Sequence, residues 1–208
     1  MKIDVSFKKQ KDIYPFIKKC GINKSFICDI NTINFNLANA IKSYGTLKLQ
    51  GDVIQLLKSK KNKTEQKGML NSHKRDGASL TKFIFWIKNQ VQNKNITEMD
   101  AIKYLDNLRK SNKNFFSLSF PTIAGTGSNG AIVHYRANKL TNKKIRKSDL
   151  FLVDSGAQYF DGTTDVTRTI SFNKPRKDQI DMYTRVLKGH IAVARSKFKY
   201  GEKGKKLD

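Results

Sequence analysis

The stretch DSGAQYFDGTTDVTRT, residues 154–169, places three aspartates in a segment that otherwise has the composition of β-strands. Acidic residues are scarce in the 208-residue chain, which holds 41 Lys and Arg against 17 Asp and Glu. Side chains alternate along a strand, so Asp154 is expected to share an apolar face with Leu150 and Leu152. In the next strand, Asp165 is expected on one face with the threonines that follow it. The pattern therefore predicts a hairpin with a carboxylate on each strand.

The pairing register decides whether these two carboxylates meet. If the strands pair about Tyr159 and Phe160, Asp154 lies directly opposite Asp165, with Cβ atoms roughly 5 Å apart. Like charges so close persist only with a shared proton or a cation between them. Arg168 is a poor candidate for that cation, because the alternation places it on the other face of the hairpin from Asp154. This register favours a metal site.

A different register follows from the dipeptide Asp161–Gly162, which is a strong signal for a tight turn. Such a turn sets Asp154 opposite Thr169 and moves the two carboxylates too far apart to share an ion. A metal site would then need a longer connection or a bulge between Gly156 and Gly162. Spacing alone leaves both registers open, and Asp161 itself is assigned to the turn.

The composition predicts a folded protein of one domain plus part of another. The formal net charge is +24, yet 38% of the residues are hydrophobic. Lysines recur evenly along the chain and far outnumber the arginines favoured for phosphate recognition, so we expect no nucleic-acid partner. No apolar run reaches the roughly 18 residues that span a bilayer, and we expect a cytoplasmic protein. Cys20 and Cys28 match neither a metal motif nor a disulfide framework.

Hydrophobic periodicity predicts an α/β chain. We expect short strands at 25–30 and 46–50 around a helix in residues 33–43, and amphipathic helices in 65–91, 97–110 and 177–198. Thr97 is the expected N-cap of the second of these, with Asp100 completing a capping box. Between the last two helices, aromatic and β-branched segments predict strands, namely FFSLSFPTIAG, AIVHYR, DLFLVDSGAQYF and TTDVTRTISF.

These segments carry a resemblance to a known family. The aspartate-rich stretch, preceded by SFPTIAGTGSNGAIVHYR and by KNKTEQKGMLNSHKRDGASL, closely resembles the catalytic domain of aminopeptidase P (Xaa-Pro aminopeptidase), a pita-bread metallopeptidase. The resemblance covers residues 52–208 and implies the first half of a pita-bread domain. Residues 1–51 resemble the end of the non-catalytic α/β domain that precedes it in this family.

The resemblance implies a site for two divalent metals, typically manganese, which polarise the carbonyl of an Xaa-Pro bond and activate a water. It maps two metal ligands onto Asp154 and Asp165 and a substrate-contacting histidine onto His134, for which a hydrogen-bonded core histidine is the alternative. Hard carboxylate oxygens suit manganese. The expected substrates are peptides with proline at the second position, and the full-length protein is expected to be a homodimer.

The sequence departs from the family in its number of ligands. The family adds one His and two Glu in segments beyond the helix expected at 177–198. The three glutamates here, Glu65, Glu98 and Glu202, lie outside such motifs, and we interpret His73 and His190 as structural. We therefore expect these 208 residues alone to be inactive. A pita-bread module without catalysis, or a polyanion-binding protein, are the alternative functions.

Overall fold

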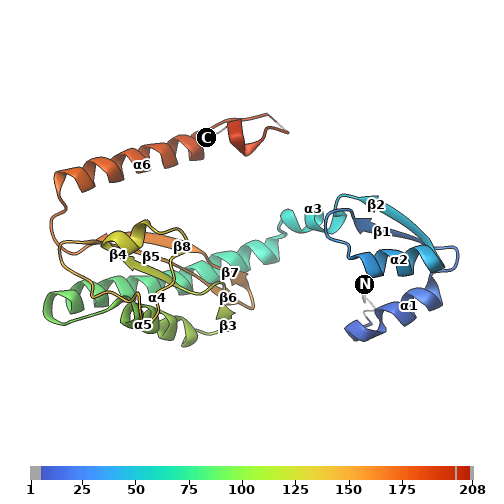
Figure 1. Ribbon diagram of the computed structural model, residues 1–208, viewed down its shortest axis with the longest axis horizontal. Coiled ribbons are helices and arrows are strands. Elements are labelled where there is room, and N and C mark those ends of the chain that lie inside the picture. Colours follow the sequence, from blue (N-terminus) through green and yellow to red (C-terminus); the bar gives the residue numbers. More distant parts are fainter. Residues whose placement is uncertain (1–5, 200, 207–208) are drawn as a thin grey trace. The chain divides into compact units, whose positions relative to one another are not determined.

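The computed structural model describes residues 6–199 and 201–206, and the chain divides into two compact units, residues 1–62 and 63–208 (Figure 1). The assignment of residues 1–51 to the end of a separate non-catalytic domain stays a prediction. Within the described residues, none of the helices combines the length and the apolar character needed to cross a membrane.

The first unit is built around a parallel β-α-β arrangement. Strand β1 pairs with β2, and the chain crosses between them through α2. The order strand, helix, strand was predicted from the sequence. Asn34 caps α2, since its side-chain oxygen accepts a hydrogen bond from the backbone N–H of Leu37 at 2.8 Å. Ile17 and Ile41 are the buried apolar residues of this unit. Its elements are η1 (Gln10–Asp12), α1 (Ile13–Cys20), β1 (Ser25–Asp29), α2 (Phe35–Tyr44), β2 (Thr46–Gln50) and α3 (Val53–Ser59).

The second unit contains two three-stranded antiparallel sheets and three long helices. One sheet has the strand order β4-β5-β8 and the other β3-β6-β7. The hairpin that was quoted first contributes to both sheets, because β5 and β8 belong to one and β6 and β7 to the other. The elements are α4 (Lys63–Asn93), α5 (Glu98–Lys110), β3 (Phe115–Leu118), β4 (Ile123–Thr126), η2 (Gly127–Ala131), β5 (Leu150–Ser155), β6 (Ala157–Tyr159), β7 (Gly162–Thr163), β8 (Val166–Ser171), α6 (Lys177–Arg195) and η3 (Gly204–Lys206).

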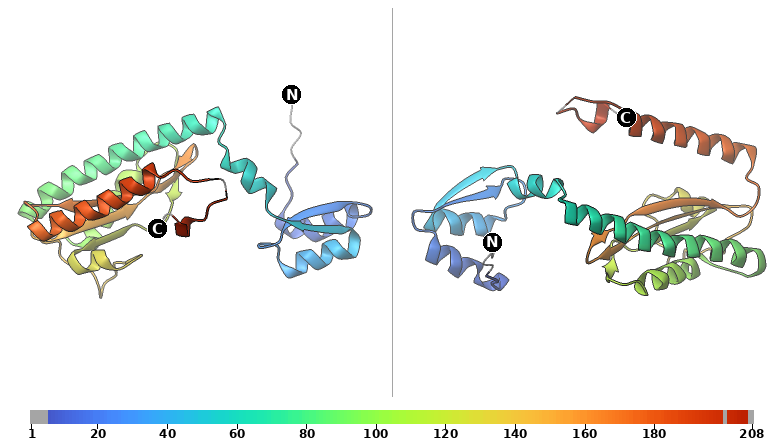
Figure 2. Two further views of the ribbon diagram at one scale, coloured as in Figure 1. Left: turned by 90° about the horizontal axis from the view of Figure 1, so that it is seen from above. Right: turned by 180° about the vertical axis from the view of Figure 1, so that it is seen from behind.

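Helices α4 and α5 cover one face of these sheets (Figure 2). Both helices were predicted, and the capping box is confirmed: Asp100 N–H donates to Thr97 Oγ1, and Thr97 N–H donates to Asp100 Oδ2. The apolar stripe of α4 packs with α5 and the core-facing side of the sheet. The core residues include Leu80, Phe83, Ile87, Val91, Ala101, Leu105, Ala124, Phe151, Val153 and Ile170.

Helix α6 lies on the other side of the sheet from α4 and α5 in Figures 1 and 2. It forms where the periodicity predicted a helix, but none of its residues is buried. Its apolar side chains stay in contact with solvent, and Ile180 and Leu187 keep 47% and 45% of their surface exposed. The helix therefore presents an apolar face that the rest of the unit does not cover.

A buried ion pair joins the two core helices. Arg109 Nε and Nη2 donate to the two carboxylate oxygens of Asp76 at 2.7 and 2.9 Å, and both side chains are almost fully buried. The Tyr159 hydroxyl donates to Asp76 Oδ1 at 2.9 Å and links β6 to the pair. Burial, reinforced by the charge of Asp76, raises the pKa of Tyr159 to about 12, so this phenol remains a donor at neutral pH.

The predicted strand AIVHYR does not form. Residues 132–134 make a bend and a turn, and His134 has a φ of 56°, a left-handed conformation that interrupts an extended strand. The next residue, Tyr135, is buried and its hydroxyl donates to Glu98 Oε2 at 2.8 Å. This long-range anchor fixes the turn, whereas the β-branched composition of the segment reflects only a local preference.

Candidate functional site

Strand β5 shows the alternation that the sequence predicted. Phe151, Val153 and Ser155 are buried toward α4 and α5, whereas Leu150, Leu152 and Asp154 are half-buried on the opposite face. Because β5 is the central strand of its sheet, Asp154 lies between Ile123 of β4 and Thr167 of β8. The carboxylate is thus held on a sheet face and not in the helix-covered core.

The observed register lies between the two that were considered. Asp154 pairs with Thr167 in the β5–β8 ladder, and Tyr159 pairs with Gly162 in the β6–β7 ladder. The turn is therefore centred on Phe160 and Asp161. Both registers considered from the sequence are wrong by one residue at the turn, in opposite directions. The register is the same in both ladders, so the hairpin contains no bulge. The turn lies one residue before the expected Asp161–Gly162 turn, and this shift alone brings the two carboxylates closer than that turn would.

The turn signal of Asp161–Gly162 was misleading because Gly162 serves packing. A Cβ atom on Gly162 would overlap Ser72 Oγ and lie 3.0 Å from Met69 Sδ on α4. The helix thus approaches the backbone of β7 closely, which requires glycine there for reasons unrelated to a turn. A second contact fixes the turn away from α4, because the Phe160 N–H donates to the Asn114 carbonyl at 3.0 Å.

Asp161 lies in the turn, as predicted, and pairs with Arg75 of α4. The hydrogen bond and charge of Arg75 lower the pKa of the Asp161 carboxyl below its usual range. The Arg75 guanidinium also lies 5.1 Å from the centre of the Tyr159 ring. This carboxylate is already neutralised, so its role is to attach the hairpin to α4.

Asp165 lies directly before β8, opposite Gly156 in the same register. It is exposed, as is Thr167, while Thr164 is buried, so the exposure pattern puts Asp165 on the Asp154 face. Asp154 and Asp165 are diagonal neighbours across the hairpin, and such positions lie roughly 7 to 8 Å apart. Two oxygen donors at that spacing fit one side of a site for hard divalent cations.

Neither carboxylate is paired with a cation among the described residues. The only hydrogen bond to the Asp154 side chain in that part of the chain comes from Thr167 Oγ1, at 2.8 Å from Oδ1. Arg168 is paired with Val153 on the core-facing side, as the alternation predicted, and its Nη1 donates to the Thr167 carbonyl. Other described carboxylates, such as Asp29 and Asp100, also form no ion pair, so it is the shared face of Asp154 and Asp165 that sets these two apart.

His134 follows η2, which folds back over the face of the sheet that carries Asp154. Gly125 pairs with Leu152, and a Cβ atom on Gly125 would lie 2.8 Å from the backbone of Asn129 and Gly130. Because residues paired directly share a face, η2 covers the part of the sheet next to Asp154. His134 is exposed, and none of the hydrogen bonds among the described residues joins it to either aspartate.

Glu98 organises this loop, a role that its place at a helix start did not reveal. The carboxylate is fully buried and accepts from the Thr126 and Lys143 backbone N–H groups at 2.8 and 3.0 Å. Asn129 Nδ2 and the Tyr135 hydroxyl supply further donors. Burial raises the pKa of Tyr135. Each of these partners lies at least 28 residues from Glu98, beyond the reach of local sequence patterns.

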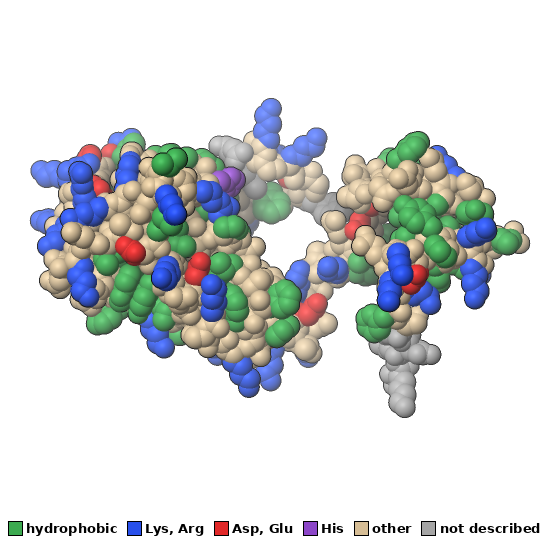
Figure 3. Space-filling view, turned by 60° about the horizontal axis from the view of Figure 1, so that its bottom comes forward, with side chains coloured by type: hydrophobic (Ala, Val, Ile, Leu, Met, Phe, Trp, Pro, Cys, Tyr) green, Lys and Arg blue, Asp and Glu red, His purple; other side chains and the backbone are tan. Residues whose placement is uncertain are grey.

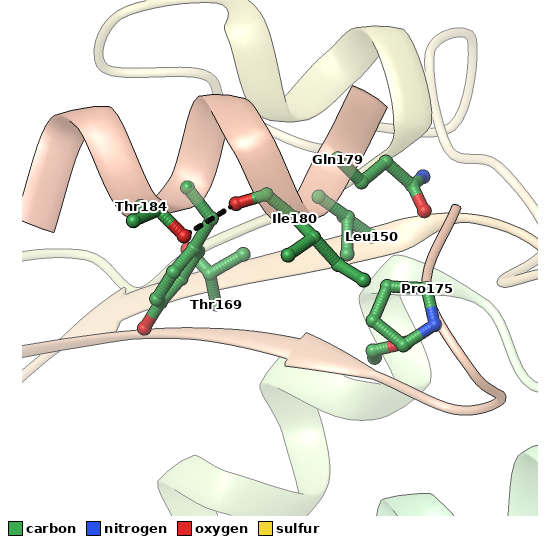
Figure 4. A pocket seen from close by; sticks show the side chains of 8 residues that line it. Leu150, Thr169, Pro175, Gln179, Ile180 and Thr184 are labelled. Carbon is green, nitrogen blue, oxygen red and sulfur yellow. Dashed lines mark hydrogen bonds between the residues drawn. The ribbon is translucent and has the colours of Figure 1, made fainter. Parts of the chain in front are cut away.

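A small pocket of about 240 Å³ opens on the same face, between the sheet and the first turns of α6. Leu150 and Thr169 of the sheet and Ile180 of α6 lie around it in Figure 4. Ser171 and Tyr183 also line it. The lining is mainly apolar, and neither Asp154 nor Asp165 contributes to it. The pocket lies toward the opposite end of β5 from Asp154, and it reflects the incomplete packing of α6.

Basic side chains are spread over both units on the face drawn in Figure 3, without one dominant patch. Within residues 6–199 and 201–206, no three His, Cys, Asp or Glu side chains are grouped closely enough to hold a metal ion. Cys20 and Cys28 are both free thiols. The two aspartates of the hairpin are thus the candidate ligands that the described residues bring together.

Comparisons with known proteins show the family of the chain. The model of metallopeptidase family M24 matches residues 67–208. Xaa-Pro aminopeptidase ApepP of Drosophila melanogaster is 43% identical over 156 residues, which are 74% of this chain and 25% of that protein. Aminopeptidase P2 of Arabidopsis thaliana is 45% identical over 156 residues, 74% of this chain and 22% of that protein.

Among solved structures, X-prolyl aminopeptidase from Caenorhabditis elegans, described as a cytosolic enzyme with a di-nuclear active site, matches with a TM-score of 0.83. The match has 35% sequence identity and covers 95% of this chain and 33% of that one. The chain spans about a quarter of the length of the curated relatives it matches.

The fold is therefore that of part of a pita-bread catalytic domain, with both expected aspartates on one sheet face. The chain belongs to metallopeptidase family M24. Within this family it resembles the Xaa-Pro aminopeptidases P.

Proposed function

We propose that this chain is part of a dinuclear Xaa-Pro aminopeptidase and supplies Asp154 and Asp165 to the metal site. The observation that carries the proposal is the pair of aspartates at diagonal positions of one hairpin, on one face, without a basic partner among the described residues. In contrast, Asp161 of the same hairpin is neutralised by Arg75.

The donor set fits hard divalent cations, for which manganese is our proposal. When bound, two such ions polarise a peptide carbonyl and lower the pKa of water. The chain's own contribution is to orient two carboxylates, one on the central strand β5 and one directly before the outer strand β8. His134, exposed at the turn after η2, is the proposed contact for the peptide substrate.

These 208 residues are proposed to be inactive alone, because two carboxylates leave most coordination positions of two metals to water. The complete protein is proposed to act on peptides with proline at the second position and to be a cytoplasmic homodimer. The C. elegans relative, which is described as cytosolic, supports the proposed location.

The test is release of the N-terminal residue from Xaa-Pro-Yaa peptides in the presence of manganese. We compare the 208-residue chain with a chain extended through the segments with which its relatives continue. The extended chain is expected to cleave Xaa-Pro-Yaa and to leave a matched Xaa-Ala-Yaa peptide intact, while the short chain cleaves neither.

Three other outcomes would contradict the proposal. Cleavage of Xaa-Pro dipeptides alone would indicate a prolidase, and removal of N-terminal methionine alone a methionine aminopeptidase. A manganese-loaded extended chain without any peptidase activity would favour a pita-bread module that has a binding role only.

A further inference from the structure

Among the described residues, the hydroxyl of Thr167 is the one polar group that contacts the Asp154 carboxylate. Thr167 is its direct cross-strand partner on β8, and Oγ1 lies 2.8 Å from Asp154 Oδ1. The partner on the other side, Ile123, is buried and has no side-chain donor. Within the described residues, Thr167 therefore gives the carboxylate its only hydrogen bond, and Oδ2 accepts none.

A carboxylate side chain turns easily about its last torsion, because that torsion has no sharply defined rotamers. A hydrogen bond to one oxygen fixes this angle and leaves the other oxygen available to a ligand. In protein metal sites, hydrogen bonds from neighbouring residues orient the coordinating side chains in this way and contribute strongly to affinity.

We infer that Thr167 is a positioning residue, whose hydroxyl holds Asp154 Oδ1 so that Oδ2 faces the metal site. This inference rests on the metal site in the proposed function and assigns a residue that orients it. Thr167 is not proposed as a metal ligand. Its hydroxyl donates to the Asp154 carboxylate and acts on the metal through that carboxylate.

The neighbouring threonine supplies a matched control. Thr169 lies on the same strand and the same face two residues later, but its cross-strand partner is Leu152. Both threonines have the same β propensity and a cross-strand partner on β5, and only Thr167 contacts a carboxylate. A general effect of removing a threonine hydroxyl from β8 would appear in both variants.

The experiment measures the manganese dissociation constant by calorimetry on the metal-free extended chain. Thr167→Val removes the hydroxyl at nearly constant shape and is expected to raise the dissociation constant about 10- to 100-fold. Thr167→Ser keeps the donor and is expected to restore affinity to near the original value. Thr169→Val is expected to bind manganese as the unaltered chain does.

Thermal unfolding without metal separates positioning from a structural role. A structural role lowers the melting temperature of Thr167→Val and leaves its manganese affinity unchanged, and that result would overturn the inference. Equal losses of affinity in Thr167→Val and Thr169→Val would overturn it as well.

The outcomes also separate this inference from the proposed peptidase. An extended chain that binds manganese through a Thr167-dependent site yet cleaves no Xaa-Pro peptide would refute the peptidase and retain the inference. If the extended chain cleaves Xaa-Pro peptides and Thr167→Val leaves its manganese affinity unchanged, the peptidase proposal is retained and the inference is refuted. An extended chain without manganese binding would refute the inference whether or not it cleaves peptides.

Discussion

Asp154 and Asp161 belong to one hairpin but have different electrostatic surroundings. Arg75 pairs with Asp161 and lowers the pKa of its carboxyl. The stability from this pair is therefore present above the ordinary aspartate pKa of about 3.9 and is lost as the pH falls through the lowered value. Asp154 has a hydroxyl donor and no basic partner among the described residues, so its negative charge remains available for a cation.

This difference predicts separate effects of substitution. In the extended chain, Asp154→Asn or Asp165→Asn is expected to abolish manganese-dependent peptide cleavage, because each variant replaces a charged ligand with a neutral amide. Asp161→Asn keeps the activity and loses the stability supplied by Arg75 at neutral pH. Peptide cleavage assays and urea unfolding of all three variants test this, and equal losses of activity would refute the ligand assignment.

At the scale of elements, the hairpin is held by close packing against α4. Gly68 of α4 faces the turn, and a Cβ atom there would overlap the carbonyl oxygen of Asp161. Gly77 lies on the same helix, and a Cβ atom there would have no neighbour within 4 Å beyond the adjacent residues and the backbone of its own helix. Two glycines of one helix thus differ in purpose, since one permits packing and the other is not required by its surroundings.

The two glycines give a matched prediction for stability. Gly68→Ala is expected to destabilise the fold by about 1 to 3 kcal/mol, because the clash exceeds the gain in helix propensity. Gly77→Ala is expected to stabilise it by about 0.5 to 1 kcal/mol. Urea unfolding followed by circular dichroism measures both changes. A stabilised Gly68→Ala variant would show that α4 does not approach the turn so closely.

The sequence predicted those elements whose signals are local. Helix α5 was found from its apolar period and its capping box, and β5 from the alternation around Asp154. The hairpin register was missed because Gly162 carries a turn signal yet serves contact with α4. Residues 132–134 were expected to be extended, but the anchor of Tyr135 on Glu98 spans 37 positions. Long-range contacts of this kind leave no periodic trace in one sequence.

For the whole molecule, the described residues contain part of a pita-bread domain and the two proposed metal ligands. Helix α6 exposes its apolar face, and three or more potential metal ligands do not gather anywhere in the described part. The net charge of +24 is dispersed over the surface on the face shown in Figure 3. The chain thus matches the longer aminopeptidases over about a quarter of their length.

Manganese calorimetry on the short and extended chains tests this view. The 208-residue chain is expected to lack sub-micromolar affinity, because two carboxylates gain little over the hydration of the ion. The extended chain is expected to bind far more tightly. Sub-micromolar binding by the short chain would show that other residues complete the site, and gel filtration of that sample would then reveal whether a second copy supplies them.

The register of the hairpin also limits which insertions and deletions the gene can tolerate. Asp154 and Asp165 share a face because Asp154 pairs with Thr167 and the side chains alternate. If one codon is gained or lost between them and one strand shifts by one residue to absorb the change, every side chain of that strand moves to the other face. Its aspartate then points toward Phe151 and Ile170. In-frame changes of an even number of residues preserve the face. Length variation in this hairpin should therefore occur in steps of two among functional descendants of this sequence.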